Sequence, residues 1–180
     1  MEIKIATARQ KDAEAFLKVG IVTRRNAYAH IFSKEVFERQ DTNFQQDIKT
    51  MSERFTRENE YYYVATADAK VVGILAVMLL SNYERYRALG YADLESLHVL
   101  PEYQGIGIGR KLFDTAIKIL LKNGADKMII GVLKDNHKAR AVYQKWGGVL
   151  DDYRQLYIKF GESYGEVFYK FEPLEEFLSK

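Results

Sequence analysis

The sequence contains no cysteine among its 180 residues, which excludes a disulfide framework, a thiolate metal site and a cysteine nucleophile. It has only two prolines and twelve glycines, and this scarcity argues against disordered linkers and low-complexity tails. No apolar run approaches the roughly 20 residues needed to span a bilayer. The first residues, MEIKIATARQKDAE, contain no cleavable apolar segment. We therefore expect a cytoplasmic protein that does not act at a membrane.

The chain also has no large excess of charge of one sign, because its 27 basic and 25 acidic residues are nearly balanced and are spread along the sequence. Nucleic-acid binding usually needs a concentrated basic face, so no nucleic-acid partner is expected. Three scattered histidines predict no metal site. The length and the hydrophobic fraction of 47% predict one globular domain over residues 1–180 with its own core.

The hydrophobic periodicity predicts an alternation of strands and helices. A strand at 2–6 precedes a helix from Asp12 to about Tyr28, and a second helical region follows the capping residue Ser33 as far as about Arg57. Strands are expected at 61–67, 71–81, 91–99 and 127–133, and near 149–159 and 164–172, with further helices at 109–122 and 136–146. This order predicts an α/β fold: a central mixed sheet with helices on both faces.

The segment QGIGIG, residues 104–109, lies between a predicted strand and a predicted helix. Glycine permits positive φ and a close approach of the backbone to an anion, and N–H groups at a helix N-terminus attract negative charge. Arg110 would place a side-chain cation opposite a diphosphate. A Walker loop requires Lys-Ser or Lys-Thr, which is absent here, and a dinucleotide fingerprint requires different glycine spacing near the start of the fold. A glycine-rich loop without a ligand is the remaining alternative.

Two motifs resemble those of the GNAT superfamily of acetyl-coenzyme-A-dependent N-acetyltransferases. The segment Gln104–Gly109 is similar to the family's Q/R-x-x-G-x-G/A signature, and residues 97–103 resemble the strand and proline turn that lead into it. Asn136, Ala139, Tyr143 and Gly147 match the helix N-x-x-A-x-x-x-Y-x-x-x-G about thirty residues downstream. The resemblance is sharp over about 91–148, which it implies to be the coenzyme-binding core of a GNAT fold.

The resemblance implies roles for individual residues. Backbone groups of Leu97, His98 and Val99 would bind the pantetheine arm of acetyl-CoA, and Asn136 would bind its amides. The pyrophosphate would be held by the turn, with N–H groups from Gly105 to Arg110; the residues concerned are Gln104, Gly105, Ile106, Gly107, Ile108, Gly109 and Arg110. Tyr143 would contact the coenzyme near its sulfur and act as the general acid.

A general base is needed because an alkylamine is mostly protonated at neutral pH. Strand alternation places Asp93 and Glu95 on the same side as Leu97, and His98 on the opposite side. Glu95 is the preferred base, because it is expected nearer the acetyl group and because spermidine/spermine acetyltransferases have Glu at this position. Asp93 replaces it if a β-bulge shifts the facing. Because alternation turns His98 to the opposite face from Glu95, His98 is expected to be a packed or capped residue rather than a base.

The resemblance implies only the chemical class of the acceptor, which is an amine. The layout resembles the PaiA-type polyamine acetyltransferases, and the acidic residues Glu35, Glu38, Asp41, Asp151 and Asp152 would suit a small cationic amine such as spermidine or spermine. The alternatives are a protein N-terminus or lysine, an amino-acid-like metabolite, and a non-catalytic acyl-CoA sensor. Such sheets often pair across an edge, which would suit a homodimer, but the sequence specifies no interface.

Overall fold

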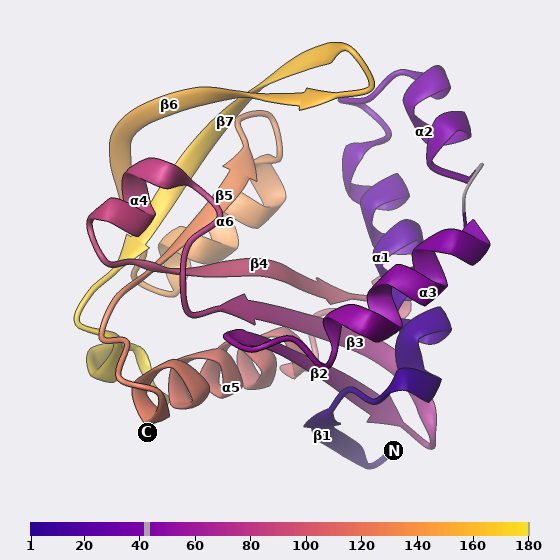
Figure 1. Cartoon of the computed structure of the whole chain (residues 1–180), viewed down its shortest axis with the longest axis horizontal. Helices are drawn as coiled ribbons and strands as arrows, with labels where there is room; N and C mark the ends of the chain where they lie inside the picture. The colour runs from indigo at the N-terminus through magenta and orange to yellow at the C-terminus, as the bar shows by residue number, and fades with distance from the viewer. Residues whose placement is uncertain (42–43, 180) are drawn as a thin grey trace.

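The computed structural model describes residues 1–41 and 44–179 and contains one seven-stranded mixed sheet in the order β1-β2-β3-β4-β5-β7-β6 (Figure 1). The strands are β1 (Ile3–Thr7), β2 (Glu60–Ala67), β3 (Lys70–Met78), β4 (Ala92–Val99), β5 (Met128–Leu133), β6 (Val149–Lys159) and β7 (Glu162–Phe171). The helices are α1 (Ala13–Tyr28), α2 (Lys34–Asp41), α3 (Phe44–Arg54), α4 (Glu84–Ala88), α5 (Ile108–Lys122) and α6 (His137–Lys145). The predicted sheet with helices on both faces is confirmed.

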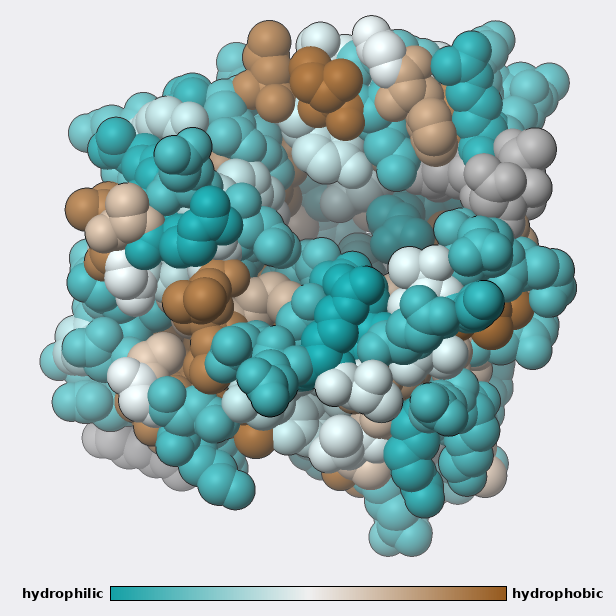
Figure 2. Space-filling view, viewed as in Figure 1, coloured by the Kyte–Doolittle hydropathy of each residue, from teal (hydrophilic) through white to brown (hydrophobic). Residues whose placement is uncertain are grey.

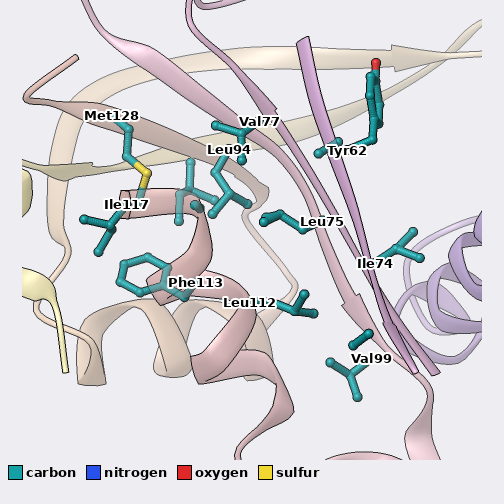
Figure 3. Close-up of a cluster of buried hydrophobic side chains, with 14 of the residues drawn as sticks. Tyr62, Ile74, Leu75, Val77, Leu94, Val99, Leu112, Phe113, Ile117 and Met128 are labelled. Carbon is teal, nitrogen blue, oxygen red and sulfur yellow. The ribbon is translucent and has the colours of Figure 1, made fainter. Parts of the chain in front are cut away.

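The two faces of the sheet are covered by different helices. Helix α5 runs beneath β2, β3 and β4, while α1 contacts β3 and β4 from the other face and α3 packs on α1 (Figure 1). Apolar side chains at helical spacing on α5, such as Leu112 and Phe113, are fully buried against the strands (Figure 3). Tyr62 and Ile74 project from the opposite face of the sheet in the same view. The main core therefore lies between α5 and the first strands, and it holds β4 firmly in place.

Strands β4 and β5 are parallel neighbours that separate soon after they begin. Ladder pairing joins only Ala92 to Met128 and Asp93 to Ile129. Beyond Asp93, β4 continues to pair with β3, and β5 continues to pair with β7. The sheet therefore opens into a wedge whose apex is Asp93, and the β5 side of β4 has no strand partner past that residue.

The long β6–β7 hairpin reaches across the top of this wedge toward the start of α2 (Figure 1). At its tip, Ser33 donates a hydrogen bond to Glu162 Oε1 at 2.5 Å, and Arg39 donates to the carbonyl oxygen of Phe160 at 3.2 Å. Ser33 Oγ also accepts from the N–H of Val36 at 3.4 Å, close to the predicted capping role. These contacts fix the hairpin to the α1–α2 connection.

Two details of the sequence prediction differ from the structure. The stretch 82–90, for which the sequence predicts no helix or strand, contains the short helix α4, held by Tyr86, which is fully buried. Helix α5 begins at Ile108 rather than at Gly109, because Gly107 in the left-handed conformation (φ 91°) is its N-cap. Within the part of the chain that the structure describes, no helix is both long and apolar enough to cross a membrane.

Candidate active site

A β-bulge in β4 determines which side chains face the wedge. Val77 pairs with Leu94 and Ala76 with Ser96, so Glu95 is an extra residue with no partner on β3. Leu97 consequently turns toward α5, where its side chain approaches Gly109, whereas His98 lines the same cavity as Glu95. The prediction that Glu95 shares its side with Leu97 and opposes His98 is therefore wrong, because strict alternation does not survive a bulge.

The wedge contains a cavity of about 400 Å³, within the usual range for small-molecule sites. Its floor is formed by β4 and β5, and its outer part by α1 and the β6–β7 hairpin. Figure 2 shows this hollow in the middle of the face, below the hairpin. The lining side chains on β4 are Asp93, Glu95, Ser96 and His98, and opposite them lie Tyr157, Lys159 and Glu166 of the hairpin. The cavity is thus lined by acidic, basic and phenolic groups together.

Asp93 is 2% exposed and lies at the apex of the wedge. Its Oδ2 accepts a hydrogen bond of 3.3 Å from the N–H of Asn82, and no cation pairs with it among the described residues. Burial raises the pKa of Asp93 to about 7; the charges of Glu95 and Glu166 add to this effect, while the Asn82 N–H opposes it. A carboxyl group that titrates near neutral pH can take a proton from an ammonium and release it again.

Glu166 lies in the same acidic part of the cavity and is 5% exposed. Tyr83 donates a hydrogen bond of 2.8 Å to its Oε1, and Gln155 donates one of 2.7 Å to its Oε2. Burial raises the pKa of Tyr83, and the charges of Glu166 and Asp93 raise it further, so the phenol stays protonated. Both oxygens of Glu166 are therefore satisfied, and its charge contributes to the field at Asp93.

Glu95, the preferred base of the sequence prediction, is held by an ion pair. Arg54 Nη2 lies 3.1 and 2.9 Å from its two carboxylate oxygens, and Arg54 Nε lies 3.0 Å from Glu60 Oε2. Tyr62 also donates a hydrogen bond to Glu60. Burial acts against the charge of Arg54, but the Glu95 carboxylate outweighs it and raises the arginine pKa. Arg54 therefore occupies both carboxylate oxygens of Glu95, whereas Asp93 has no cationic partner among the described residues.

His98 is a neutral residue of the cavity wall. Burial, together with the positive charge of Arg24, lowers the pKa of His98 to about 3. An imidazole with so low a pKa is a poor base at neutral pH. The expectation that His98 is packed rather than basic agrees with this environment, although its predicted facing does not.

The glycine turn has the backbone conformation that an anion site needs. Gly105 and Gly107 have φ values of 78° and 91°, and a Cβ placed on either would meet no atom within 4 Å. Their surfaces therefore open to solvent at the N-terminus of α5. Gly109 differs, because it is helical and a Cβ there would contact Leu97 and Trp146 at 3.9 Å. Only two of the three glycines thus have a conformation that favours glycine.

The polar side chains beside this turn are already engaged. Gln104 donates from Nε2 to the carbonyl oxygen of Val99 at 2.8 Å and accepts from Lys138 Nζ at 2.8 Å, so it fixes the turn to β4 and α6. Arg110 pairs with Asp114 at 3.0 Å and donates to Ser179 Oγ at 2.8 Å and to the carbonyl oxygen of Phe177. The guanidinium thus anchors the C-terminal segment. The sequence prediction instead places this side chain opposite a diphosphate.

The motif residues Asn136 and Tyr143 of the predicted helix 136–146 lie close to Tyr28 of the cavity wall. Asn136 is 7% exposed and caps α6, where its Oδ1 accepts from the N–H of Ala139 at 3.2 Å. Tyr143 packs on Trp146 and Tyr169, at centroid distances of 6.1 and 5.9 Å. Burial raises the pKa of Tyr143, and its hydroxyl has no hydrogen-bond partner among the described residues. Tyr143 does not itself line the cavity.

Sequence reasoning missed several residues of the cavity, above all Arg24, Tyr28 and Lys159. The spacing of four residues from Gly20 to Arg24 to Tyr28 is the signal that could have placed them on one face of α1.

The acidic residues expected near the acceptor lie elsewhere. Glu38 pairs with Lys34 at 3.3 Å, and Asp151 accepts a hydrogen bond of 2.7 Å from Tyr86. Glu35 and Asp152 are exposed and do not line the cavity, and the side chain of Asp41 is outside the described part of the chain. The acidic residues that do line the cavity are Asp93, Glu95 and Glu166.

Comparison with known proteins gives matches to a family model and to individual proteins. A family model described as the Acetyltransferase (GNAT) family matches residues 24–148. An uncharacterised N-acetyltransferase of Archaeoglobus fulgidus is 25% identical over 144 residues, which cover 78% of this chain and 89% of that protein. A spermidine N(1)-acetyltransferase of Thermoplasma acidophilum is 25% identical over 155 residues, which cover 84% of this chain and 91% of that protein.

Solved structures share the fold over nearly the whole chain. The PaiA N-acetyltransferase of Thermoplasma acidophilum, crystallised with coenzyme A, matches with a TM-score of 0.75 at 22% identity, covering 96% of this chain and 99% of that one. The yncA acetyltransferase of Salmonella typhimurium, solved with acetyl-CoA, matches with a TM-score of 0.68 at 17% identity, covering 96% and 94%. At these identities the likeness concerns the fold.

Proposed function

Because the chain belongs to the Acetyltransferase (GNAT) family, we propose that it transfers an acetyl group from acetyl-CoA to a primary amine held in the β4–β5 cavity, with Asp93 as the general base. The observation that carries this proposal is the position of Asp93. It is a buried carboxyl group at the apex of an open wedge, without a cationic partner among the described residues, and its pKa is about 7. No other carboxyl group of the cavity combines these properties.

The residues of the chain fit the coenzyme in two places. The open backbone at Gly105 and Gly107 can accept a diphosphate on N–H groups that no side chain covers. The β5 side of β4, unpaired beyond Asp93, offers backbone groups of Leu97, His98 and Val99 to the pantetheine arm. Asn136 lies at the end of β5, where its amide can bind the same arm. Acetyl-CoA supplies the acetyl group as a thioester.

Two residues of the chain move protons in this proposal. Asp93 accepts a proton from the bound ammonium, which frees the nitrogen lone pair to attack the acetyl carbon. A C–N bond forms and the C–S bond breaks, with its electron pair leaving on sulfur. Tyr143 gives its phenolic proton to the sulfur, and the second proton that the new amide nitrogen must lose restores the phenol. The unpartnered hydroxyl and raised pKa of Tyr143 suit a neutral donor. Glu95 is fixed by Arg54 and shapes the wall of the cavity.

A small amine fits the cavity better than a protein segment, because the hairpin tip is bonded to the α1–α2 connection and roofs the site. The acidic residues Asp93 and Glu166 suit the ammonium of such an amine, and the similarity to the Thermoplasma spermidine acetyltransferase makes a polyamine one of the candidates. A protein N-terminus or lysine would need that roof to open.

The experiment is an assay of thiol release from acetyl-CoA with a panel of acceptors: spermidine, spermine, diamines, amino acids and a peptide amine. We expect turnover with at least one small amine and little with the peptide. Thermal-shift titration should show stabilisation by acetyl-CoA, with ATP and NAD much weaker. Stabilisation by the coenzyme without thiol release for any acceptor would instead support an acyl-CoA sensor. Turnover that is unchanged in Asp93→Asn would refute the base.

A further inference from the structure

The outer part of the cavity holds two cations that the proposed chemistry does not use. Arg24 of α1 and Lys159 of β6 both line it. Within the part of the chain that the structure describes, neither makes an ion pair or a hydrogen bond to a carboxylate. Lys159 Nζ lies 4.8 Å from the centre of the Phe160 ring, and Arg24 is flanked by Tyr28 and Tyr157.

Burial disfavours the charged form of both side chains. Burial lowers the pKa of Arg24, and the nearby hydroxyls of Tyr28 and Tyr157 and the charge of Asp47 oppose the shift without removing it. Burial also lowers the pKa of Lys159; the charge of Arg24 lowers it further, and Asp47 again opposes. Two neighbouring, partly desolvated cations gain free energy when an anion binds between them.

The same cavity also has acidic lining residues, of which Asp93 and Glu166 are buried. A polyamine carries only positive charge, so in this cavity it would also meet the cations Arg24 and Lys159. A molecule that carries both an ammonium and a carboxylate matches both kinds of lining group. We infer that the acceptor is an amino acid or a similar amino carboxylate, whose carboxylate binds Arg24 and Lys159 while its amine lies at Asp93.

This inference rests on the proposed acetyl transfer and names its substrate class. A coenzyme phosphate is a less suitable partner for Arg24, because no residue of the glycine turn lines this cavity. A guanidinium accepts a carboxylate through two parallel hydrogen bonds, and the tyrosine hydroxyls beside it can donate to the same group. Arg24 is thus a specificity-determining residue.

The test compares amines that differ only in the carboxylate: lysine with cadaverine, ornithine with putrescine, phenylalanine with phenethylamine, and methionine with its decarboxylated amine. Binding to the coenzyme-A-saturated protein is measured by calorimetry, so the result does not depend on turnover. In at least one pair the acid should bind about tenfold to a hundredfold more tightly, as expected for a charge-assisted contact. Equal or tighter binding of the amine in every pair would overturn the inference.

Variants separate this site from the coenzyme site. Arg24→Met and Lys159→Met should each remove most of the carboxylate preference and leave the dissociation constant of acetyl-CoA unchanged. Arg25→Met, at an exposed neighbour on α1, is the matched control and should change neither. Arg24→Glu should reverse the preference in favour of cadaverine and spermidine. A parallel loss of coenzyme affinity in Arg24→Met would show that the cations serve the coenzyme and would refute the inference.

The two proposals fail in different ways. Thiol release with amines but without any carboxylate preference would refute the amino carboxylate and keep the acetyl transfer. Carboxylate-dependent binding without thiol release would refute the transfer and keep the site.

Discussion

Arg54 donates from a single guanidinium nitrogen to both carboxylate oxygens of Glu95, at 3.1 and 2.9 Å. This contact ties α3 to the bulge of β4 and occupies the carboxylate that sequence reasoning favours as the base. Asp93, two residues earlier on the same strand, accepts a 3.3 Å bond from the Asn82 N–H and interacts with the Ser81 hydroxyl, and no cation pairs with it among the described residues. The two carboxylates therefore have different chemistry, set by their partners.

Asp93→Asn should lower kcat by about a hundredfold or more, because the amide cannot take the proton from the acceptor. Glu95→Gln should lower kcat by less than about tenfold. In this proposal Glu95 does not accept the proton of the acceptor; its contact with Arg54 only holds the bulge of β4 in place. Steady-state thiol release with one acceptor measures both. If Glu95→Gln were the more damaging change, the base would be Glu95.

The pH profile should report Asp93 directly. The pKa of His98 is about 3 and that of Tyr143 is raised above its ordinary value, so neither titrates between pH 5 and 9. The base must be ionised, so kcat should rise about tenfold per pH unit below 7 and level off above it. The inflection near pH 7 should be absent from the residual activity of Asp93→Asn. A flat wild-type profile over this range would exclude Asp93.

The raised pKa of Asp93 also affects stability. Its folded-state pKa of about 7 lies above the ordinary carboxyl value of 3.8, so the folded protein binds the proton more tightly. Its contribution is fully favourable below about pH 4 and is lost as pH rises to about 7. The shift of about three pH units corresponds to at most roughly 4 kcal/mol. Asp93→Asn should therefore raise the melting temperature at pH 8 and lose this advantage as pH falls toward 4, as measured by calorimetry.

Tyr143→Phe should lower kcat by about tenfold or more, because the sulfur loses its proton donor. The affinity for acetyl-CoA should change little, and so should stability, since the hydroxyl has no hydrogen-bond partner among the described residues that the substitution would break. Tyr169→Phe is a control on the adjacent aromatic, whose hydroxyl accepts a 3.3 Å bond from Arg140. Unchanged turnover in Tyr143→Phe would remove the acid role.

Local patterns predicted the fold because each element carries its own signal. The apolar stripe of α5 and the glycines that precede it are contained in fewer than twenty consecutive residues, so a reader of the sequence can find both. The bulge at Glu95 has no such signal, because it arises from the pairing of β4 with β3, which is a tertiary relationship.

Side-chain partners distant in sequence were equally hidden. The pairing of Arg54 with Glu95 joins residues 41 positions apart, and that of Arg110 with the carbonyl of Phe177 joins residues 67 apart. Residue type alone made Glu95 a base and Arg110 a phosphate ligand. The folded chain gives both side chains other partners, and it brings Arg24 and Lys159 into one cavity from opposite ends of the sequence.

Arg110→Ala should weaken the C-terminal segment rather than the coenzyme site. The guanidinium bonds Asp114, Ser179 and the carbonyl of Phe177, and it lies 5.2 Å from the centre of the Phe113 ring. We expect a loss of about 1–2 kcal/mol in unfolding free energy and faster hydrogen exchange near Phe177. The dissociation constant of acetyl-CoA should stay within about threefold of the wild type. A larger loss of affinity would show that the side chain turns to the diphosphate when the coenzyme binds.

Gly107→Ala and Gly109→Ala test whether backbone conformation makes the anion site. Gly107 has φ 91°, where an alanine costs about 1–2 kcal/mol, and its new Cβ would occupy the open surface over the turn. Gly109 is helical, so alanine there should stabilise α5 by up to about 1 kcal/mol. Its Cβ would point toward Leu97 and Trp146, away from that surface.

Coenzyme affinity, measured by calorimetry, should therefore fall at least about tenfold in Gly107→Ala and remain near wild type in Gly109→Ala. Melting temperatures of both variants show whether a lost affinity reflects unfolding. Equal losses of affinity in the two folded variants would mean that the coenzyme approaches the whole glycine segment from the Gly109 side. Because the two positions differ by only two residues and by the sign of φ, the comparison isolates the left-handed turn as the source of the site.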